Sequence, residues 1–342
     1  MRWHFVTLLV FTVFASPVTS APLEIKTINE AQLHGPMPTK EQINPILIKA
    51  QVLLDRAHFS PAEIDGKSGD NFKKALAAFA ATQGLNSGGQ LNAEVWQRLT
   101  SPSSEPVLIE YTISDEDVRG SFVKKIPAQL EKMKDLPALP YTSPREKLAE
   151  KFHMSQELLS TLNPRQKFET ANDRIVVANI AVNGTGKGHS CRGRQKRSGF
   201  EGVRPRSAAS GNISNHRRKH GKTGANGRLK VTSITKNPTY RYNPKYGFKG
   251  VRATEPFTVK PGPNNPVGVV WIGLSDEGYG IHGTPDPSKV SKTASHGCIR
   301  LTNWDALRVA SAVAKGTPVD FSGDEQTASR SRAETPRRRQ HR

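Results

Sequence analysis

The feature that most constrains this chain is a stretch, residues 184–226, in which no regular element is visible. It holds eleven Lys or Arg residues and a single acid, Glu201, and its only large apolar residues are Phe200, Val203 and Ile213. Such a segment cannot bury enough apolar surface to offset the entropy lost on ordering. The length of 342 residues allows two or three domains, so this segment separates those before it from those after it.

The basic charge of the chain is concentrated in two pieces. The formal net charge is +20, of which residues 184–226 contribute +10 and residues 329–342, with six Arg and Glu334, contribute +5. A basic chain can indicate a nucleic-acid partner. Here the charge is local and says little about what the folded parts bind, so we expect no nucleic-acid partner.

Residues 1–20 are typical of a secretory signal peptide. Arg2 precedes an apolar run from Phe5 to Ala15, and small residues, Val18-Thr19-Ser20, stand before Ala21. The run is too short to span a bilayer. An uncleaved anchor is the alternative. No later stretch is apolar enough to span, so we expect no integral membrane span.

The part before the basic segment predicts two small modules. Residues 22–43 are polar and are expected to be a loose leader. A helix is expected to start at Asn44-Pro45, a second at Asp70 with Gly84 as its stop, and a third after Asn92. Their apolar residues, among them Leu53, Phe79 and Trp96, predict a three-helix bundle over 44–100.

The second module is expected over residues 107–180. Residues 107–113 alternate as a strand, and Ser143 with Glu146 predicts a capping box that opens a helix. Another helix is expected from Ser155, and Arg174–Val177 reads as a second strand. The pattern is therefore strand, two helices, strand.

The part after the basic segment is mostly strands, over residues 227–322. Strands are predicted at 229–234, 267–274, 279–282, 298–301 and 317–321. A helix capped by Thr302 is expected to place Leu307, Ala310, Val313 and Ala314 on its inner face and to stop at Gly316. Residues 323–342 are expected to be a basic, disordered tail.

The residues that carry chemistry lie in Ile281–Leu301. His282 is followed sixteen positions later by Cys298, and glycines flank both, Gly283 and Gly297. A thiol attacks as thiolate, and a nearby imidazole can take its proton. Gly297 allows a tight turn in which amide N–H groups face an oxyanion.

This stretch resembles the signature of the L,D-transpeptidases, the YkuD-type catalytic domain. The family signature is a His-Gly pair, a loop, then Ser/Thr-His-Gly-Cys, matched here by His282-Gly283 and by Ser295, His296, Gly297 and Cys298. Residues 44–100 resemble a peptidoglycan-binding helical module, and residues 107–180 resemble a LysM-type βααβ module; a generic bundle and a packing linker are the alternatives. The fold class is therefore expected to be multidomain α+β, with a mainly-β, sandwich-like catalytic domain carrying one helix.

The resemblance implies acyl transfer through a cysteine thioester. Cys298 would be the nucleophile and His282 the base, with the Gly283 carbonyl orienting the imidazole. The amides of Gly297 and Cys298 would bind the oxyanion. Ser295 and His296 would shape the substrate pocket, and Arg300 would hold a substrate carboxylate; a structural hydrogen bond for His296 and a surface salt bridge for Arg300 are the alternatives.

The implied reaction is a 3→3 peptidoglycan cross-link with release of D-alanine, in the periplasm or cell wall. The partners would be a tetrapeptide donor and, as acceptor, a stem amine or a wall-anchored protein. No cofactor and no metal are expected, although His282, His296 and Cys298 could be mistaken for zinc ligands. Three alternatives stay open: an L,D-carboxypeptidase using the same residues, a non-catalytic wall-binding protein, and a disulfide between Cys191 and Cys298.

The flanks of the basic segment lead to one further hypothesis. The family normally places the first strands of the catalytic domain before Leu229, where this chain carries Arg, Gly, Ser and His without pattern. Both edges of the segment are abrupt. Two compensating frame shifts in the coding sequence would leave such a gap, and a genuine disordered insertion is the alternative.

Overall fold

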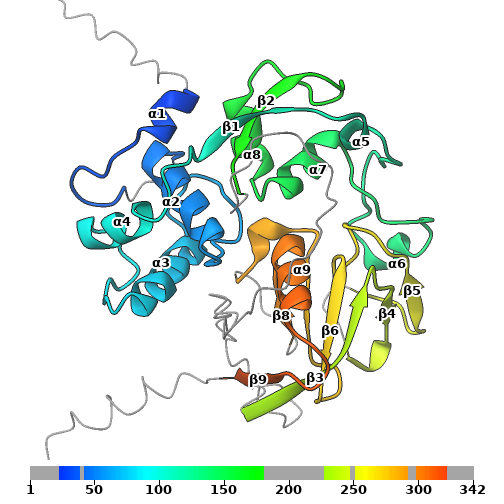
Figure 1. Ribbon diagram of the computed structural model, residues 1–342. Coiled ribbons are helices and arrows are strands. Elements are labelled where there is room, and N and C mark those ends of the chain that lie inside the picture. Colours follow the sequence, from blue (N-terminus) through cyan, green and yellow to red (C-terminus); the bar gives the residue numbers. More distant parts are fainter. Residues whose placement is uncertain (1–22, 39–41, 181–226, 247–250, 292–297, 322–342) are drawn as a thin grey trace, which may run out of the picture.

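The computed structural model of the chain describes residues 23–38, 42–180, 227–246, 251–291 and 298–321. Figure 1 shows three parts: helices α1–α4, a middle region with β1 and β2, and a C-terminal sheet around β3 and β6. The predicted signal peptide 1–20, the basic segment 184–226 and the tail 323–342 lie wholly outside the described residues. The frame-shift hypothesis therefore stays a prediction.

The first part contains the three predicted helices and one more. Its helices are α1 Ile25–Asn29, α2 Pro45–Arg56, α3 Asp70–Thr82 and α4 Ala93–Thr100. Asn44 and Asn92 cap α2 and α4 by accepting backbone N–H bonds, as their positions predicted. The expected loose leader is wrong for the described residues of 22–43, because Ile28 is fully buried and the Asn29 side chain bonds the backbone of Leu108.

The middle region pairs its two predicted strands and adds helices between them. Its elements are β1 Leu108–Thr112, α5 Asp115–Val118, α6 Leu130–Met133, α7 Pro144–Lys151, α8 Gln156–Leu162 and β2 Arg174–Ala178. The strands are antiparallel, with Leu108 opposite Ala178. The predicted capping box at α7 is only half formed: Ser143 accepts from Glu146 N, but the Glu146 carboxylate turns to Thr142 instead.

The two predicted N-terminal modules share one apolar core. Buried residues of the helices, such as Leu54 and Phe72, belong to the same cluster as Leu148 and Val177 of the middle region. A parallel bridge between Ile64 and Met154 ties the two backbones together. The first half of the chain is therefore packed as one body.

The C-terminal sheet has the strand order β8-β7-β6-β3-β9. The strands are β3 Gly227–Lys236, β6 Val270–Leu274, β7 Gly280–His282, β8 Ile299–Arg300 and β9 Pro318–Phe321. Of these five described strands, β7 and β8 pair in parallel, and the other neighbours in the sheet pair antiparallel. A separate ribbon pairs β4 Tyr240–Tyr242 with β5 Phe257–Val259. The short 3-10 helix η1 Pro244–Tyr246 follows β4, and η2 Pro287–Lys289 follows β7.

Helix α9, Asn303–Ala312, covers this sheet through Ala306 and Ala310. Three predictions about the region are wrong in detail. Leu307 is 42% exposed, so it does not lie on the inner face, and the helix ends at Ala312 before Gly316. The strand expected from Val267 begins at Val270, because Gly268 takes a positive φ of 63° in a turn. The sandwich-like arrangement stays a prediction.

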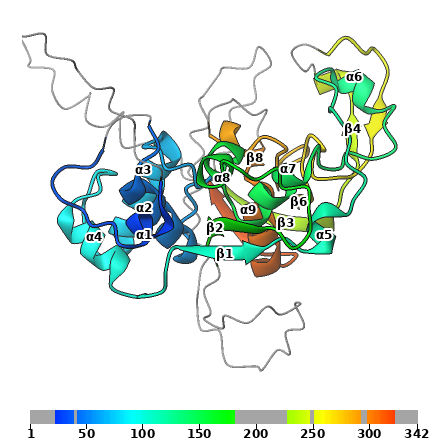
Figure 2. The same cartoon turned by 90° about the horizontal axis from the view of Figure 1, so that it is seen from above.

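Helix α9 is also where the three parts of the molecule meet. Figures 1 and 2 show α7, α8 and β2 stacked over it, with the N-terminal helices alongside. Buried Asp55 of α2 accepts a bond from Arg308 Nη2 at 3.1 Å and lies 3.0 Å from His153 Nδ1. The His153 ring stacks on Trp304, with centroids 4.9 Å apart. Although burial raises the pKa of Asp55, the bonds from His153 and Arg308 bring it below its ordinary value.

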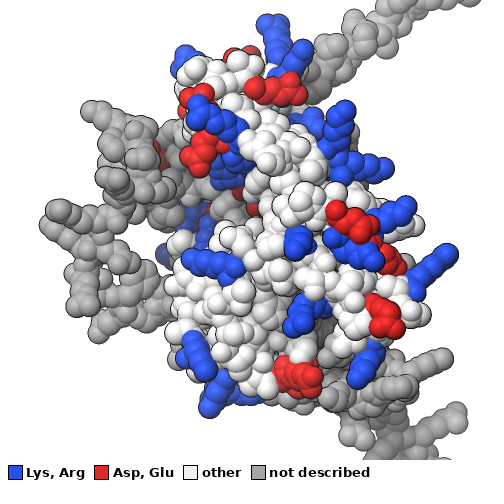
Figure 3. Space-filling view, turned by 90° about the vertical axis from the view of Figure 1, so that its right-hand side faces the viewer, with Lys and Arg blue, Asp and Glu red and all other residues white. Residues whose placement is uncertain are grey.

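The surface of the described residues shows no concentration of basic charge on the face in Figure 3. Lys and Arg side chains there are scattered among Asp and Glu. Within the described residues, no helix is both long and apolar enough to cross a membrane.

Candidate active site

His282 ends strand β7 with its imidazole buried and its protons assigned by geometry. The side chain is 5% exposed, and its Nδ1 lies 2.6 Å from the carbonyl oxygen of Gly283. A carbonyl only accepts, so Nδ1 carries the proton and Nε2 is left with a lone pair. The imidazole is therefore preset to accept a proton at Nε2.

The electrostatic surroundings keep this imidazole neutral. Burial lowers the pKa of His282 to about 4, the Gly283 carbonyl opposes that shift, and the charge of Arg300 adds to it. At neutral pH the ring is in the form that can take a proton.

The Trp271 ring stacks on one face of the His282 imidazole. Trp271 pairs directly with His282 across β6 and β7, and the two rings stack with centroids 5.6 Å apart and planes at 18°. The ring fits because residue 280 is glycine: a Cβ there would lie 2.5 Å from the Trp271 ring. The sequence predicts Trp271 only as part of a strand. The neighbouring strand that ends at His282 was the available indication that an aromatic residue here could contact the imidazole.

Cys298 directly precedes β8 and is present as a partly exposed thiol. In the parallel pair, Ile281 lies opposite Ile299 and His282 opposite Arg300. Side chains alternate along a strand, so Cys298 projects to the same face of the sheet as Arg300 and His282. Its Sγ lies 3.4 Å from the carbonyl oxygen of Gly278.

Arg300 and Tyr240 lie close enough to Cys298 for a negative charge on its sulfur to raise their pKa values. Burial lowers the pKa of Arg300, while Cys298 and Asp286 raise it. Burial, then Tyr242, then Cys298 raise the pKa of Tyr240 to about 12. A cation beside a thiol favours its thiolate, so the charge of Arg300 can favour the thiolate of Cys298; the predicted substrate contact of Arg300 stays a prediction. Tyr240 was not among the predicted site residues.

The predicted pocket residues Ser295, His296 and Gly297 lie outside the described residues. Of the predicted oxyanion donors, only the amide of Cys298 is in the described part of the chain. The roles of all four residues stay predictions. Among the described residues, no group of three His, Cys, Asp or Glu side chains could hold a metal ion.

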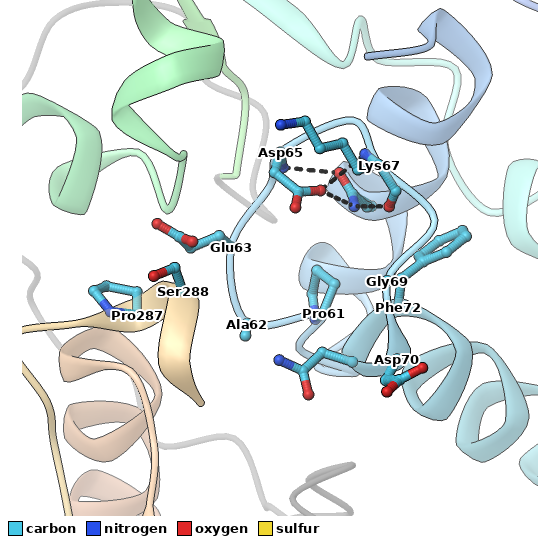
Figure 4. A pocket seen from close by; sticks show the side chains of 12 residues that line it. Pro61, Ala62, Glu63, Asp65, Lys67, Gly69, Asp70, Phe72, Pro287 and Ser288 are labelled. Carbon is cyan, nitrogen blue, oxygen red and sulfur yellow. Dashed lines mark hydrogen bonds between the residues drawn. The ribbon is translucent and has the colours of Figure 1, made fainter. Parts of the chain in front are cut away.

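A cleft separates the first half of the chain from the loop that follows His282. It is lined by residues between Pro61 and Phe72 on one side and by Pro287 and Ser288 on the other, and Figure 4 shows Glu63 directed toward Ser288. Asn71 Nδ2 bridges the two sides by donating to the carbonyl oxygen of Val290 at 3.0 Å. The first half of the chain thus contacts the loop after His282 directly.

Comparison with known families agrees with this geometry. The family model described as the L,D-transpeptidase catalytic domain, YkuD, matches residues 192–320. The chain carries a YkuD L,D-transpeptidase catalytic domain. The match to this domain begins inside the basic segment, whereas the residue pattern placed the start at 227.

Similar proteins carry the same family name. The chain is 48% identical over 63 residues to L,D-transpeptidase YkuD of Bacillus licheniformis, covering 18% of this chain and 38% of the relative. It is 33% identical over 106 residues to L,D-transpeptidase YqjB of Bacillus subtilis, covering 30% of this chain and 53% of the relative. It is 35% identical over 94 residues to L,D-transpeptidase YbiS of Escherichia coli, covering 27% of this chain and 29% of the relative. The chain therefore spans about half or less of the length of these relatives.

Proposed function

We propose that this chain is a peptidoglycan L,D-transpeptidase that works through a thioester on Cys298. The observation that carries the proposal is the state of His282: neutral, with Nδ1–H held by the Gly283 carbonyl, and on the same sheet face as Cys298. A thiol and a preset imidazole on one face form the pair that nucleophilic acyl transfer needs.

The first half of the reaction forms the thioester. The Cys298 Sγ proton passes to His282 Nε2, and the sulfur attacks the carbonyl of the residue at position three of a tetrapeptide stem. The oxyanion is bound by the amides of Gly297 and Cys298. The C–N bond to the terminal D-alanine then breaks, and the proton returns from His282 to the leaving amine.

The second half transfers the acyl group to an amine. A side-chain amine of a second stem attacks the thioester carbonyl, a new C–N bond forms, and the C–S bond breaks. The amine proton restores the Cys298 thiol through His282. The product is a 3→3 cross-link, and a wall-anchored protein that offers an amine would be attached by the same step. Arg300, with Ser295 and His296, would hold the donor.

This chemistry fits action in the periplasm or cell wall. The predicted signal peptide over 1–20 supports export, and the bundle over 44–100 and the module over 107–180 would bring the chain to peptidoglycan.

A mass measurement tests the proposal. A carbapenem carries a strained amide that acylates a reactive thiol, so the intact mass of the full chain should rise by one adduct that peptide mapping places on Cys298. Cys298→Ala should give none. An adduct that persists in Cys298→Ala, or a wild-type chain that stays unmodified, would refute the assignment.

The acceptor is tested separately with tetrapeptide muropeptides. Cross-linked dimers with released D-alanine would support the transpeptidase. Tripeptides alone, even with excess amine acceptor, would identify the chain as a carboxypeptidase.

A further inference from the structure

Glu150, a carboxylate of the middle region, is linked to His282 through Asn303 and the Gly283 peptide. Glu150, on α7, accepts a bond from Asn303 Nδ2 at 3.0 Å to Oε2 and one from the Tyr141 hydroxyl at 2.8 Å to Oε1. Glu150 is about 150 residues away from Asn303 in sequence and belongs to a different part of the fold. Since the family model covers only 192–320, Glu150 stands outside the matched catalytic domain.

Asn303 is fully buried and uses every polar atom of its side chain. Its Nδ2 also donates to the carbonyl oxygen of Pro263 at 3.1 Å, and its Oδ1 accepts from the amide of Val269 at 3.2 Å. A buried amide with all its bonds made has one orientation, because any rotation leaves a polar atom unpaired.

The Asn303 side chain is in turn packed against the peptide that orients His282. A Cβ on Gly283 would lie 2.2 Å from Asn303 Oδ1, and one on Gly268 would lie 2.0 Å from the same atom and 2.6 Å from the Gly283 carbonyl carbon. These three residues therefore interlock without space for a methyl group. The Gly283 carbonyl that they fix is the one that holds His282 Nδ1.

We propose that Glu150 is a positioning residue for His282, acting through Asn303 and the Gly283 peptide, so that the middle region sets the orientation of the catalytic base. The inference rests on the proposed function in that His282 is taken as the base. It assigns to residues 107–180 a task in catalysis itself, beyond any contact with the wall.

The charge of Glu150 makes this link sensitive to pH. The groups that face it among the described residues are Tyr141 from the preceding segment, Asn303 from α9 and Glu146 on its own helix, and Glu146 is itself bonded by Asn264. Burial, with a contribution from Glu146, raises the pKa of Glu150 to about 7, against the bonds from Tyr141 and Asn303. Only the carboxylate offers both oxygens as acceptors without also burying an O–H that needs a partner.

The test compares full-length Glu150→Gln with wild type and with Glu110→Gln. Glu110 is an exposed glutamate of β1 in the same region, paired with Arg174, so its substitution removes the same charge without touching the link. The rate of carbapenem adduct formation on Cys298 is measured from pH 5.5 to 9 at saturating and at low reagent. We expect the maximal rate of Glu150→Gln at pH 8 to fall about tenfold with an unchanged half-saturating concentration, because a small misplacement of the base slows the chemical step.

The pH profile supplies the decisive signature. Wild type and Glu110→Gln should show a step near pH 7 that Glu150→Gln lacks. Tyr141→Phe, which keeps the carboxylate but removes a donor to it, should move that step to higher pH and serves if the Gln variant does not fold. A Glu150→Gln or Tyr141→Phe variant with the wild-type rate and profile would overturn the proposal.

A second readout separates this proposal from the proposed function. In ¹⁵N-histidine-labelled protein, the His282 Nδ1 and Nε2 shifts should move on Glu150→Gln and stay put on Glu110→Gln, even if the chain acylates poorly. If the wild type forms no adduct, the proposed function fails while the shifts still decide the positioning role. Unchanged His282 ¹⁵N chemical shifts in Glu150→Gln would by themselves contradict the positioning role.

Discussion

The first half of the chain and the catalytic sheet are stabilised in different ways. Residues 23–180 build one continuous apolar core from two predicted modules, whereas the apolar cluster of the catalytic sheet is much smaller and has Ile272 and Ile281 near its centre. Between them lie polar contacts onto α9: Asp55 with Arg308, Ser60 with Asp305 at 2.5 Å, and Glu150 with Asn303. Within the described residues, the two apolar cores are therefore separate, and polar contacts onto α9 join them.

The largest effect is expected at the point where the two regions interlock. In Gly283→Ala the new methyl must displace Asn303 Oδ1, 2.2 Å away, and with it the carbonyl that holds His282. Because a misplacement near 1 Å can cost about a hundredfold, we expect acylation of Cys298 to slow by about that factor. Gly69→Ala, where a Cβ meets nothing within 4 Å, is the matched control and should acylate like wild type. Equal acylation rates for Gly283→Ala and Gly69→Ala would show that the contact between Gly283 and Asn303 does not position His282.

The next effect concerns the shared core of the first half. Leu148 is fully buried on α7, so Leu148→Ala should lower the free energy of unfolding by about 2–5 kcal/mol through lost burial and the cavity left behind. In thermal unfolding, probes in the first half of the chain and in the catalytic sheet should show the same lowered melting temperature. Exposed Leu307, truncated to Ala, is the control and should shift the curve little. A change confined to the first half would show that the two regions unfold separately.

The third effect is the pH dependence of stability from Glu150. Its pKa is raised from the ordinary 4.5 to about 7, so the folded chain holds a proton that the unfolded chain releases between those values. The free energy of unfolding should therefore fall by about 2–3 kcal/mol as pH rises through this window. Denaturant titrations at pH 5 and pH 8 measure it, and Glu150→Gln should remove this part of the difference. A Gln variant that is as stable as wild type at pH 8 but slower would separate orientation from stability.

The smallest effect is expected on the outer surface of the middle region. Arg174 and Glu110 form an exposed pair across β1 and β2. Exposed pairs contribute about 0–1 kcal/mol, so Arg174→Ala should change the unfolding midpoint only slightly and leave acylation unchanged. A loss as large as that of Leu148→Ala would show that the strand pair depends on charge rather than on the core.

Local signals in the sequence predicted many of the elements and one contact of His282 well. Asn44, Asn92 and Thr302 begin helices as their side chains indicated, and Gly283 accepts from His282 as the resemblance implied. These features depend on residues close together in the chain, where capping and turn chemistry act directly.

The contacts between regions could not be predicted in this way. Glu150 reads as one more charged residue on a helix, and nothing nearby in sequence indicates that Asn303 covers it. Helical spacing predicts both Leu307 and Ala310 on the inner face, but only Ala310 of these two lies in the core, together with Ala306, while Trp304 stacks on His153. The elements that pack against a helix determine which face it buries. Helix α9 contacts the sheet, the middle region and α2, so its own sequence does not determine its buried face.

Hydrogen exchange on the full chain tests the central claim most directly, that the two regions unfold as one unit. Leu54 is fully buried in α2, far in sequence from the catalytic sheet, so Leu54→Ala removes core packing from the first half only. We predict that the opening free energy of the most protected amides falls by the same amount in α2 and in β6, since global unfolding exposes both. Amides of β6 that keep their wild-type protection while those of α2 lose it would contradict the account.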